Sequence, residues 1–179
     1  MFTYKSKKFH IKTVKTKSPN GKYAISEVLL KGSTGVGILP VSNDGHVVLA
    51  YHHRPAVKKR IYSLPGGKIK RGESPKAAAR RELLEELGYK ANSIVPLAKL
   101  YTTPYFSNDA PYMFLASGIK YAGSRPDADE NIEPRKFTIA KAMKMVDSGA
   151  IEDMSTVTAL LLLWRRMHKG GVKNGKRSK

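Results

Sequence analysis

Three glutamates in one short segment are the side chains of this sequence best suited to chemistry. Glu82, Glu85 and Glu86 stand at positions i, i+3 and i+4, so in a helix they fall within one sector of roughly 100°. Like charges at this spacing repel by roughly a few tenths of a kcal/mol per exposed pair. Mg²⁺ or Mn²⁺ would relieve that repulsion, because both prefer oxygen ligands and can activate water. The alternative is an ordinary acidic face in contact with solvent.

A helix over residues 75–87 is predicted to carry these glutamates. Ser74 is a good N-cap, Pro75 suits the first turn, and Gly88 suits the position just past the end. Arg81 precedes Glu85 by four residues and can neutralise one carboxylate. The helix therefore has a clear beginning, a clear end and a compensating charge.

The segment around this helix resembles the Nudix box, in which a glycine and a glutamate precede a glutamate-rich helix. Tyr89, where an aliphatic residue is usual, is the one departure. The residues that match the motif at its spacing are Gly67, Glu73, Arg81, Glu82, Leu83, Glu85, Glu86 and Gly88. With so many fixed positions in a short stretch, a chance match is improbable. The sequence is therefore identified as a member of the Nudix hydrolase family.

The resemblance implies a metal-dependent hydrolase that cleaves a nucleoside diphosphate linked to another group. It implies that Mg²⁺ or Mn²⁺ is the cofactor, held by the metal ligands Glu82, Glu85 and Glu86 together with the carbonyl of Gly66. Arg81 and Glu73 would then be structural and hold the loop to the helix through a charge-assisted pair. The bend at Gly66 and Gly67 would let the backbone approach metal and phosphate closely.

Four further segments resemble the ADP-ribose pyrophosphatase branch of the family. Ser63 departs from that branch, which usually has Glu at this position, and Tyr105 follows Pro104 where Gly is often found. The segments are residues 47–54, residues 62–67, the region of Pro104, and residues 129–133 with 145–153. The resemblance implies a nucleotide-sugar substrate, ADP-ribose or another ADP-sugar, cleaved to AMP and a sugar phosphate.

The same resemblance assigns roles outside the box. Glu130 on an acidic loop matches the general base best and Glu133 is next, while Glu85 is included among the catalytic residues. Arg54 would grip a phosphate through its guanidinium, with a structural role at a strand end as the alternative. Tyr105 and Phe106 would either stack on adenine or pack. For Glu130 and Glu133 the alternative is a solvated loop acid.

Two other functions stay open at this stage. The first is a Nudix hydrolase acting on RNA 5′ ends or dinucleotides, suggested by the basic termini. The second is a non-catalytic nucleotide- or RNA-binding module, which the intact set of glutamates disfavours. Dimers are common in the ADP-ribose pyrophosphatase branch, so the strands predicted within residues 1–30 are candidates for a homodimer contact.

Strands and helices are interspersed along the chain. Helices are predicted over residues 75–87, 139–146 and 154–168, the last capped by Asp153 or Ser155. Residues 55–60 and 124–133 are predicted loops, and strands are predicted over residues 8–17, 22–30, 35–41, 46–53, 61–64, 94–102 and 111–116. This order indicates an α/β (α+β) class, and the family resemblance implies a Nudix-like α/β/α sandwich with a mixed β-sheet.

The composition fits one globular domain with basic ends. The formal net charge is +19, but residues 1–22 and 165–179 each carry seven Lys or Arg and no acid. Basic termini favour nucleic acid as a partner, although solvated termini are the simpler explanation. There is no cysteine and no long apolar run, so neither disulfides nor a membrane partner is predicted. The absence of cysteine does not indicate a compartment, and the cytoplasm is taken as the default location. We expect a domain over residues 1–169 and a flexible basic tail over 170–179.

Overall fold

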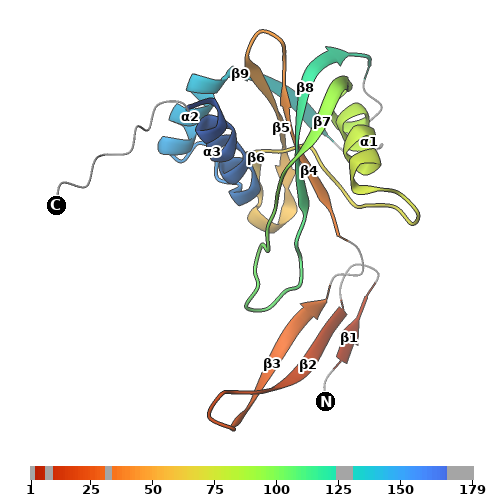
Figure 1. Cartoon of the computed structure of the whole chain (residues 1–179), viewed down its shortest axis with the longest axis vertical. Helices are drawn as coiled ribbons and strands as arrows, with labels where there is room; N and C mark the ends of the chain where they lie inside the picture. The colour runs from red at the N-terminus through yellow and green to blue at the C-terminus, as the bar shows by residue number, and fades with distance from the viewer. Residues whose placement is uncertain (1–2, 7–9, 31–33, 124–130, 169–179) are drawn as a thin grey trace, which may run out of the picture.

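The computed structural model describes residues 3–6, 10–30, 34–123 and 131–168. The described residues form three helices, a short 3₁₀ segment and two β-sheets (Figure 1). The helices are α1 (Pro75–Leu87), α2 (Ile139–Asp147) and α3 (Met154–His168), and the 3₁₀ segment η1 covers Pro55–Val57. The strands are β1 (Thr3–Lys5), β2 (His10–Lys17), β3 (Tyr23–Leu30), β4 (Val36–Val41), β5 (His46–Arg54), β6 (Lys59–Ser63), β7 (Tyr89–Lys99), β8 (Tyr112–Tyr121) and β9 (Ile132–Thr138).

The larger sheet is mixed. Its strands follow the order β6-β5-β4-β8-β7, and β9 pairs with β5 outside this path. β4 and β8 are parallel, whereas the pairs β4–β5, β5–β6, β5–β9 and β7–β8 are antiparallel. The predicted mixed α/β class is therefore confirmed.

Helices cover both faces of this sheet (Figure 1). Along β5, Val47 and Leu49 join the apolar cluster that α2 and α3 complete, while Val48 and Ala50 join the cluster that α1 completes. Successive residues of a strand point to opposite faces, so one apolar strand serves both cores. The molecule is the three-layered α/β/α sandwich that the family resemblance implied.

The smaller sheet, β1-β2-β3, extends away from the sandwich (Figure 1). Its connection to the body is made at the end of β3, where Leu29 donates to the carbonyl of Phe106 at 2.6 Å and accepts from the amide of Asn108 at 3.4 Å. Tyr4, Tyr23 and Ile25 are more than half exposed on it. A sheet of this size has little core of its own.

The predicted helices agree closely with the structure, and some strand predictions were wrong. Ile132 and Glu133 lie in β9 rather than in a loop, and β7 begins at Tyr89 rather than at residue 94. Lys59 and Arg60 belong to β6 instead of the predicted basic loop, and β1 was not predicted. These strands carry charged residues or proline, which weakens an alternating pattern. β9 is stabilised by pairing with β5, far away in the sequence, whereas β1, β6 and β7 pair with strands adjacent in the chain. None of the described helices is long and apolar enough to cross a membrane.

Candidate active site

Helix α1 is fixed at both ends by the residues that the sequence singled out. The Ser74 hydroxyl accepts from the amide of Ala77 at 3.2 Å, and Pro75 occupies the first turn. Gly88 has φ 76°, and its amide donates to the carbonyls of Leu83 and Leu84. Because this left-handed conformation suits glycine, the helix ends immediately after the glutamates.

Two of the three glutamates are buried against the bend that precedes the helix. Glu82 and Glu86 are only 8% and 7% exposed. A carboxylate oxygen of Glu86 accepts from the amide of Gly66 at 2.8 Å. A Cβ atom on Gly67 would stand 2.2 Å from Oε1 of Glu82. The backbone therefore approaches these carboxylates more closely than any other residue type at position 67 would allow.

Arg81 is the basic residue that links the acidic side chains of this segment. Its Nη1 donates to Glu82 Oε1 at 2.7 Å and to Glu85 Oε2 at 2.8 Å, and its Nε donates to Glu73 Oε1 at 2.9 Å. Nη2 donates to the carbonyl of Lys68 at 3.0 Å. The hydrogen bonds from Arg81 hold the pKa of Glu73 at about 2, below its usual 4.5. The guanidinium thus ties the loop that contains Glu73 to the glutamates of α1.

The three carboxylates do not meet at one point, which differs from the expected convergence. Among the described residues, no three His, Asp or Glu side chains are grouped to hold a metal ion. Arg81 bonds Glu82 and Glu85, and Glu86 bonds Gly66. Burial raises the pKa of Glu82. A cation bound nearby would oppose this effect by favouring the ionised carboxylate. An all-oxygen donor set beside the Gly66–Gly67 bend fits a hard divalent cation.

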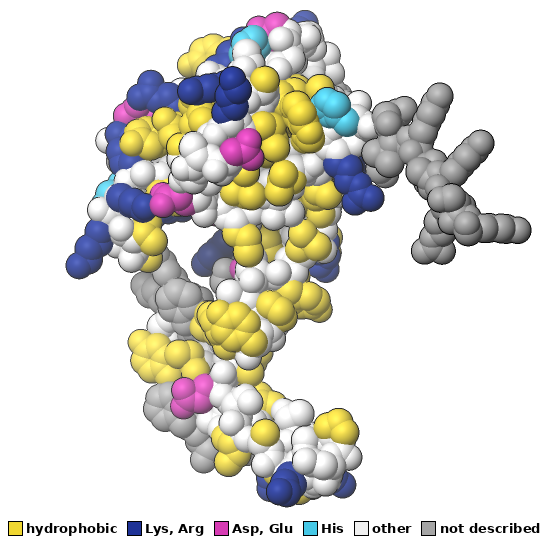
Figure 2. Space-filling model, turned by 90° about the vertical axis from the view of Figure 1, so that its left-hand side faces the viewer, with side chains coloured by type: hydrophobic (Ala, Val, Ile, Leu, Met, Phe, Trp, Pro, Cys, Tyr) yellow, Lys and Arg dark blue, Asp and Glu magenta, His cyan; other side chains and the backbone are white. Residues whose placement is uncertain are grey.

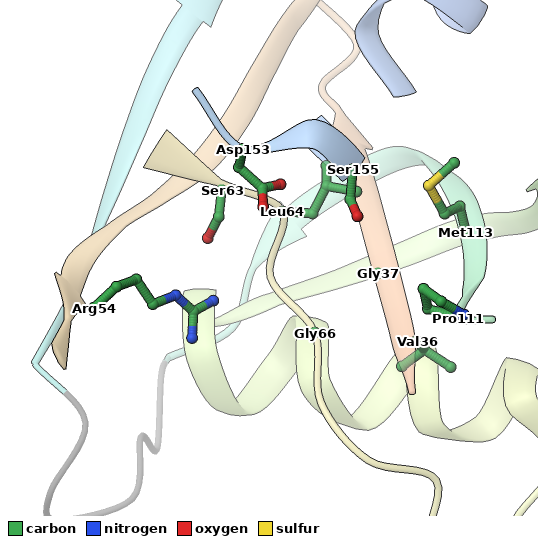
Figure 3. A pocket seen from close by; sticks show the side chains of 10 residues that line it. All are labelled: Val36, Gly37, Arg54, Ser63, Leu64, Gly66, Pro111, Met113, Asp153 and Ser155. Atoms are coloured by element: carbon green, nitrogen blue, oxygen red, sulfur yellow. The ribbon is translucent and has the colours of Figure 1, made fainter. Parts of the chain in front are cut away.

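A cavity of about 140 Å³ opens beside Gly66 (Figure 3). The guanidinium of Arg54, from the end of β5, points into it, and Asp153 and Ser155 reach it from the start of α3. The lining consists of Val36, Gly37, Arg54, Ser63, Leu64, Gly66, Pro111, Met113, Asp153 and Ser155. The guanidinium of Arg54 therefore lies at the same cavity as the backbone that adjoins the glutamates.

A buried pair of side chains supports one wall of the cavity. His52 Nε2 and Ser63 Oγ are 2.8 Å apart, and the two residues are 7% and 3% exposed. Burial, followed by the charge of Arg54, lowers the pKa of His52 to about 4. His52 is therefore neutral near pH 7, with one ring nitrogen engaged by Ser63.

The neutral state of His52 should give the protein a characteristic loss of stability in acid. Between about pH 6.5 and about pH 4, the unfolded chain protonates His52 whereas the folded protein does not. The unfolded state then binds more protons, so the free energy of unfolding should fall as the pH falls through this window. His52→Gln keeps a hydrogen-bonding group for Ser63 and does not titrate, so this part of the pH dependence should disappear.

Urea unfolding at several pH values within that window measures the effect. His53→Gln, at the exposed neighbouring position, is the matched control and should keep the wild-type slope. Equal slopes for wild type and His52→Gln would show that His52 titrates alike in both states.

Tyr105 and Phe106 lie away from this cavity. Tyr105 is 78% exposed, and its ring packs edge-to-face on Phe106 with centroids 4.7 Å apart. Phe106 lines a second, apolar hollow of about 320 Å³ together with Val28 and Leu30 of β3. The structure does not bring either ring to Arg54 or the glutamates, and the packing alternative describes their contacts better.

Of the two acids predicted as candidates for the general base, the structure describes Glu133 and does not describe Glu130. Glu133 lies in β9, where it forms a salt bridge with Arg60 at 2.6 Å and a second with Arg135. It does not line the cavity. Glu130 lies outside the described residues. The role of either acid stays a prediction, and the two ion pairs of Glu133 disfavour it as a proton acceptor.

The sequence did not predict a functional role for two residues beside the cavity, His52 and Asp153. His52 alternates with Arg54 along β5, so both point to the same face, and this period of two was the available signal. Asp153 was considered only as a helix cap. It does cap α3, accepting from the amide of Thr156 at 2.8 Å, and it also faces the cavity (Figure 3).

Comparison with known proteins agrees with this geometry. The family model of the NUDIX domain matches residues 32–161. The chain is 31% identical to an ADP-ribose pyrophosphatase of Bacillus subtilis (strain 168), over 81% of this chain and 79% of the relative. It is 29% identical to a methanol dehydrogenase activator of Bacillus methanolicus, over the same shares of each chain.

A solved structure provides the matching fold. The crystal structure of an ADP compounds hydrolase superposes with a TM-score of 0.83, at 25% identity, over 93% of this chain and 90% of that one. The motif, the α/β/α sandwich, the family model and the relatives all agree. This chain belongs to the Nudix hydrolase family and is related to its ADP-ribose pyrophosphatases.

Proposed function

We propose that the protein hydrolyses the diphosphate of ADP-ribose, or of a related ADP-sugar, to AMP and a sugar phosphate. The observation that carries this proposal is the position of Gly66. Its amide binds Glu86 of α1, and the same residue lines the cavity that contains Arg54. The acidic helix α1 and the guanidinium of Arg54, which we propose binds a phosphate, thus adjoin one backbone segment. The similarity to an ADP-ribose pyrophosphatase and to an ADP compounds hydrolase supports the choice of substrate class.

Mg²⁺ or Mn²⁺ is the proposed cofactor. Glu82, Glu85 and Glu86, with the carbonyl of Gly66, are the residues that would hold it, since all four offer oxygen to a hard cation. When bound, such a cation neutralises diphosphate charge and lowers the pKa of water. Arg81 holds Glu82 and Glu85, and a cation would share these carboxylates with its guanidinium.

The protein groups of the proposed site divide the remaining work. Arg54 binds a phosphate through its planar guanidinium, which matches phosphate oxygens. Glu73 and Arg81 keep the loop against α1. Glu85 and Glu130 are the proposed catalytic carboxylates, with Glu130 as the base that accepts the proton of water. Glu133, the second match to the acidic loop, is less suited to this role because Arg60 and Arg135 already engage it.

A substrate panel tests the proposed function. Purified protein is incubated with Mg²⁺ or Mn²⁺ and with ADP-ribose, ADP-glucose, GDP-mannose, a dinucleotide or capped RNA, and nucleoside monophosphate release is measured. We expect AMP release to be fastest from ADP-ribose or ADP-glucose and to require the metal. Cleavage of dinucleotides or capped RNA, with both ADP-sugars intact, would replace the proposed substrate class by another. Binding without cleavage of any compound would support a non-catalytic module.

A homodimer through the β1–β3 sheet is part of the proposal. Tyr4, Tyr23 and Ile25 lie on one face of this sheet. Their cross-strand partners in β2, Ile11, Lys17 and Lys15, are separated by even numbers of residues and therefore point to the same side. These exposed apolar groups on a sheet with little core suit a second copy of the chain. Light scattering after size exclusion should report a dimer, and Ile25→Lys should shift it towards monomer. Val95→Lys, at an exposed position of β7, is the control, and a monomeric wild type would exclude the dimer.

On the face that Figure 2 shows, the arrangement of the described basic side chains does not favour nucleic acid as the main partner. Lys and Arg form several separate groups on the face that Figure 2 shows, with hydrophobic side chains between them, rather than one stripe. A continuous basic track is what the nucleic acid backbone requires. We therefore propose a small nucleotide-sugar substrate as the main partner. A single Nudix domain over residues 1–169 and a cytoplasmic location are also part of the proposal, and the predicted basic tail over residues 170–179 lies outside the described residues.

A further inference from the structure

The cavity beside Gly66 has two chemically different walls. Arg54, Ser63 and Asp153 converge from one side, and Pro111 and Met113 lie on the other (Figure 3). None of the ten described residues that line it is aromatic. Its volume of about 140 Å³ is well below the roughly 300–1,000 Å³ of pockets that enclose whole ligands. The cavity therefore suits one part of a substrate, with a polar edge and an apolar face.

Ser63 offers a hydrogen-bonding group at a fixed position of the polar wall. Its hydroxyl is bonded to His52 Nε2 at 2.8 Å, and both side chains are buried. A hydroxyl that is held by one partner still has a donor or acceptor role left for a second. Because Ser63 also lines the cavity, this hydroxyl is placed to bond a group of a ligand bound there. His52 acts through Ser63 and is a positioning residue.

Asp153 offers a carboxylate that is equally fixed. Its Oδ1 accepts from the amide of Thr156 at 2.8 Å and from the Thr156 hydroxyl at 2.6 Å. The same hydroxyl accepts from the amide of Leu64 at 2.8 Å. Among the described residues these bonds of Asp153 fall on Oδ1, so Oδ2 is available to accept from a ligand. The start of α3 and the strand exit at Leu64 are thereby joined at the cavity.

We propose that this cavity binds the sugar ring of the substrate, with Ser63 and Asp153 reading its vicinal hydroxyls. A sugar ring has a hydroxyl edge and a C–H face, which match the polar and apolar walls. A nucleobase would favour an aromatic surface for stacking, and a second phosphate would be repelled by Asp153. Arg54 at the mouth binds the phosphate joined to the sugar. The inference rests on the proposed function, since it specifies the second half of the same substrate.

The test measures binding rather than turnover, which separates it from the substrate panel. The dissociation constants of ribose 5-phosphate and 2-deoxyribose 5-phosphate are determined by calorimetry with the full-length protein and Mg²⁺. We expect wild type to bind ribose 5-phosphate about tenfold more tightly, because a buried polar group left without its partner is unfavourable. Equal affinities would overturn the proposal, even if ADP-ribose is a substrate. This comparison in the wild type needs no variant to fold.

Variants locate the effect on named side chains. Ser63→Ala should bring the ratio of the two dissociation constants close to one, whereas Ser117→Ala, at an exposed position of β8, should leave the ratio at its wild-type value. His52→Gln can still bond Ser63 and should retain most of the selectivity, and His52→Leu should lose it. An unchanged ratio in Ser63→Ala would show that this hydroxyl does not read the sugar. Rescue by glutamine distinguishes positioning from simple packing at His52.

Discussion

Glu86→Gln is expected to lower kcat/KM for the ADP-sugar by about 10²-fold or more while the fold persists. Glu86 is buried, and its carboxylate accepts from the amide of Gly66 at 2.8 Å. Glutamine has nearly the same shape and can still accept that bond through its amide oxygen. It removes the negative charge that a divalent cation needs, so the loss should appear in turnover rather than in stability.

Steady-state kinetics over a range of Mg²⁺ concentrations, with the thermal midpoint of the same samples, measures this prediction. Glu152→Gln is the matched control. Glu152 is exposed and paired with Lys59 at 2.7 Å, and a surface pair of this kind contributes at most about 1 kcal/mol. The control should keep wild-type kinetics. If Glu86→Gln turned over at the wild-type rate, Glu86 would have no part in holding the cation.

Gly67→Ala is expected to reduce both activity and stability through a single steric conflict. The added Cβ would stand 2.2 Å from Oε1 and 2.6 Å from Cδ of Glu82. Glu82 cannot swing into open solvent without leaving its buried position and its 2.7 Å bond from Arg81. We expect kcat/KM to fall by about 10²-fold and the free energy of unfolding to fall by about 1–3 kcal/mol.

Gly149→Ala separates this conflict from the general effect of replacing a glycine. Gly149 has φ 73°, and a Cβ there would meet nothing within 4 Å. Its substitution strains the backbone by roughly 1–2 kcal/mol but should leave the kinetics unchanged. Urea unfolding and steady-state kinetics of both variants make the comparison. A Gly67→Ala protein with wild-type activity would mean that the Gly67 backbone and Glu82 need not lie so close.

Local chemistry in the sequence determined the helix that carries the glutamates. Ser74, Pro75 and Gly88 set the ends of α1 at the predicted residues, because capping bonds and a left-handed glycine act within one turn. The bounds of α3 were predicted for the same reason, and of its two predicted caps, Asp153 and Ser155, the structure has Asp153. The spacing of the box residues likewise identified the family before any three-dimensional arrangement was known.

Tertiary structure alone decided what surrounds these glutamates. The sequence placed Glu82 and Glu86 on one helical face, but their burial results from the Gly66–Gly67 bend, which lies about twenty residues earlier in the chain. The cavity joins residues from β5, β6, β8 and the start of α3, and sequence spacing gives no measure of such distances. β9 has no strong pattern of its own and exists through its pairing with β5.

The sequence by itself therefore determined the chemical groups and the element that presents them, since capping and spacing are local. The tertiary structure decided which groups are buried and that His52, Ser63 and Asp153 stand beside Arg54. The physical reason is that burial, the cavity and the pairing of β9 with β5 depend on contacts between segments far apart in the chain, and these contacts form only when the sheet forms.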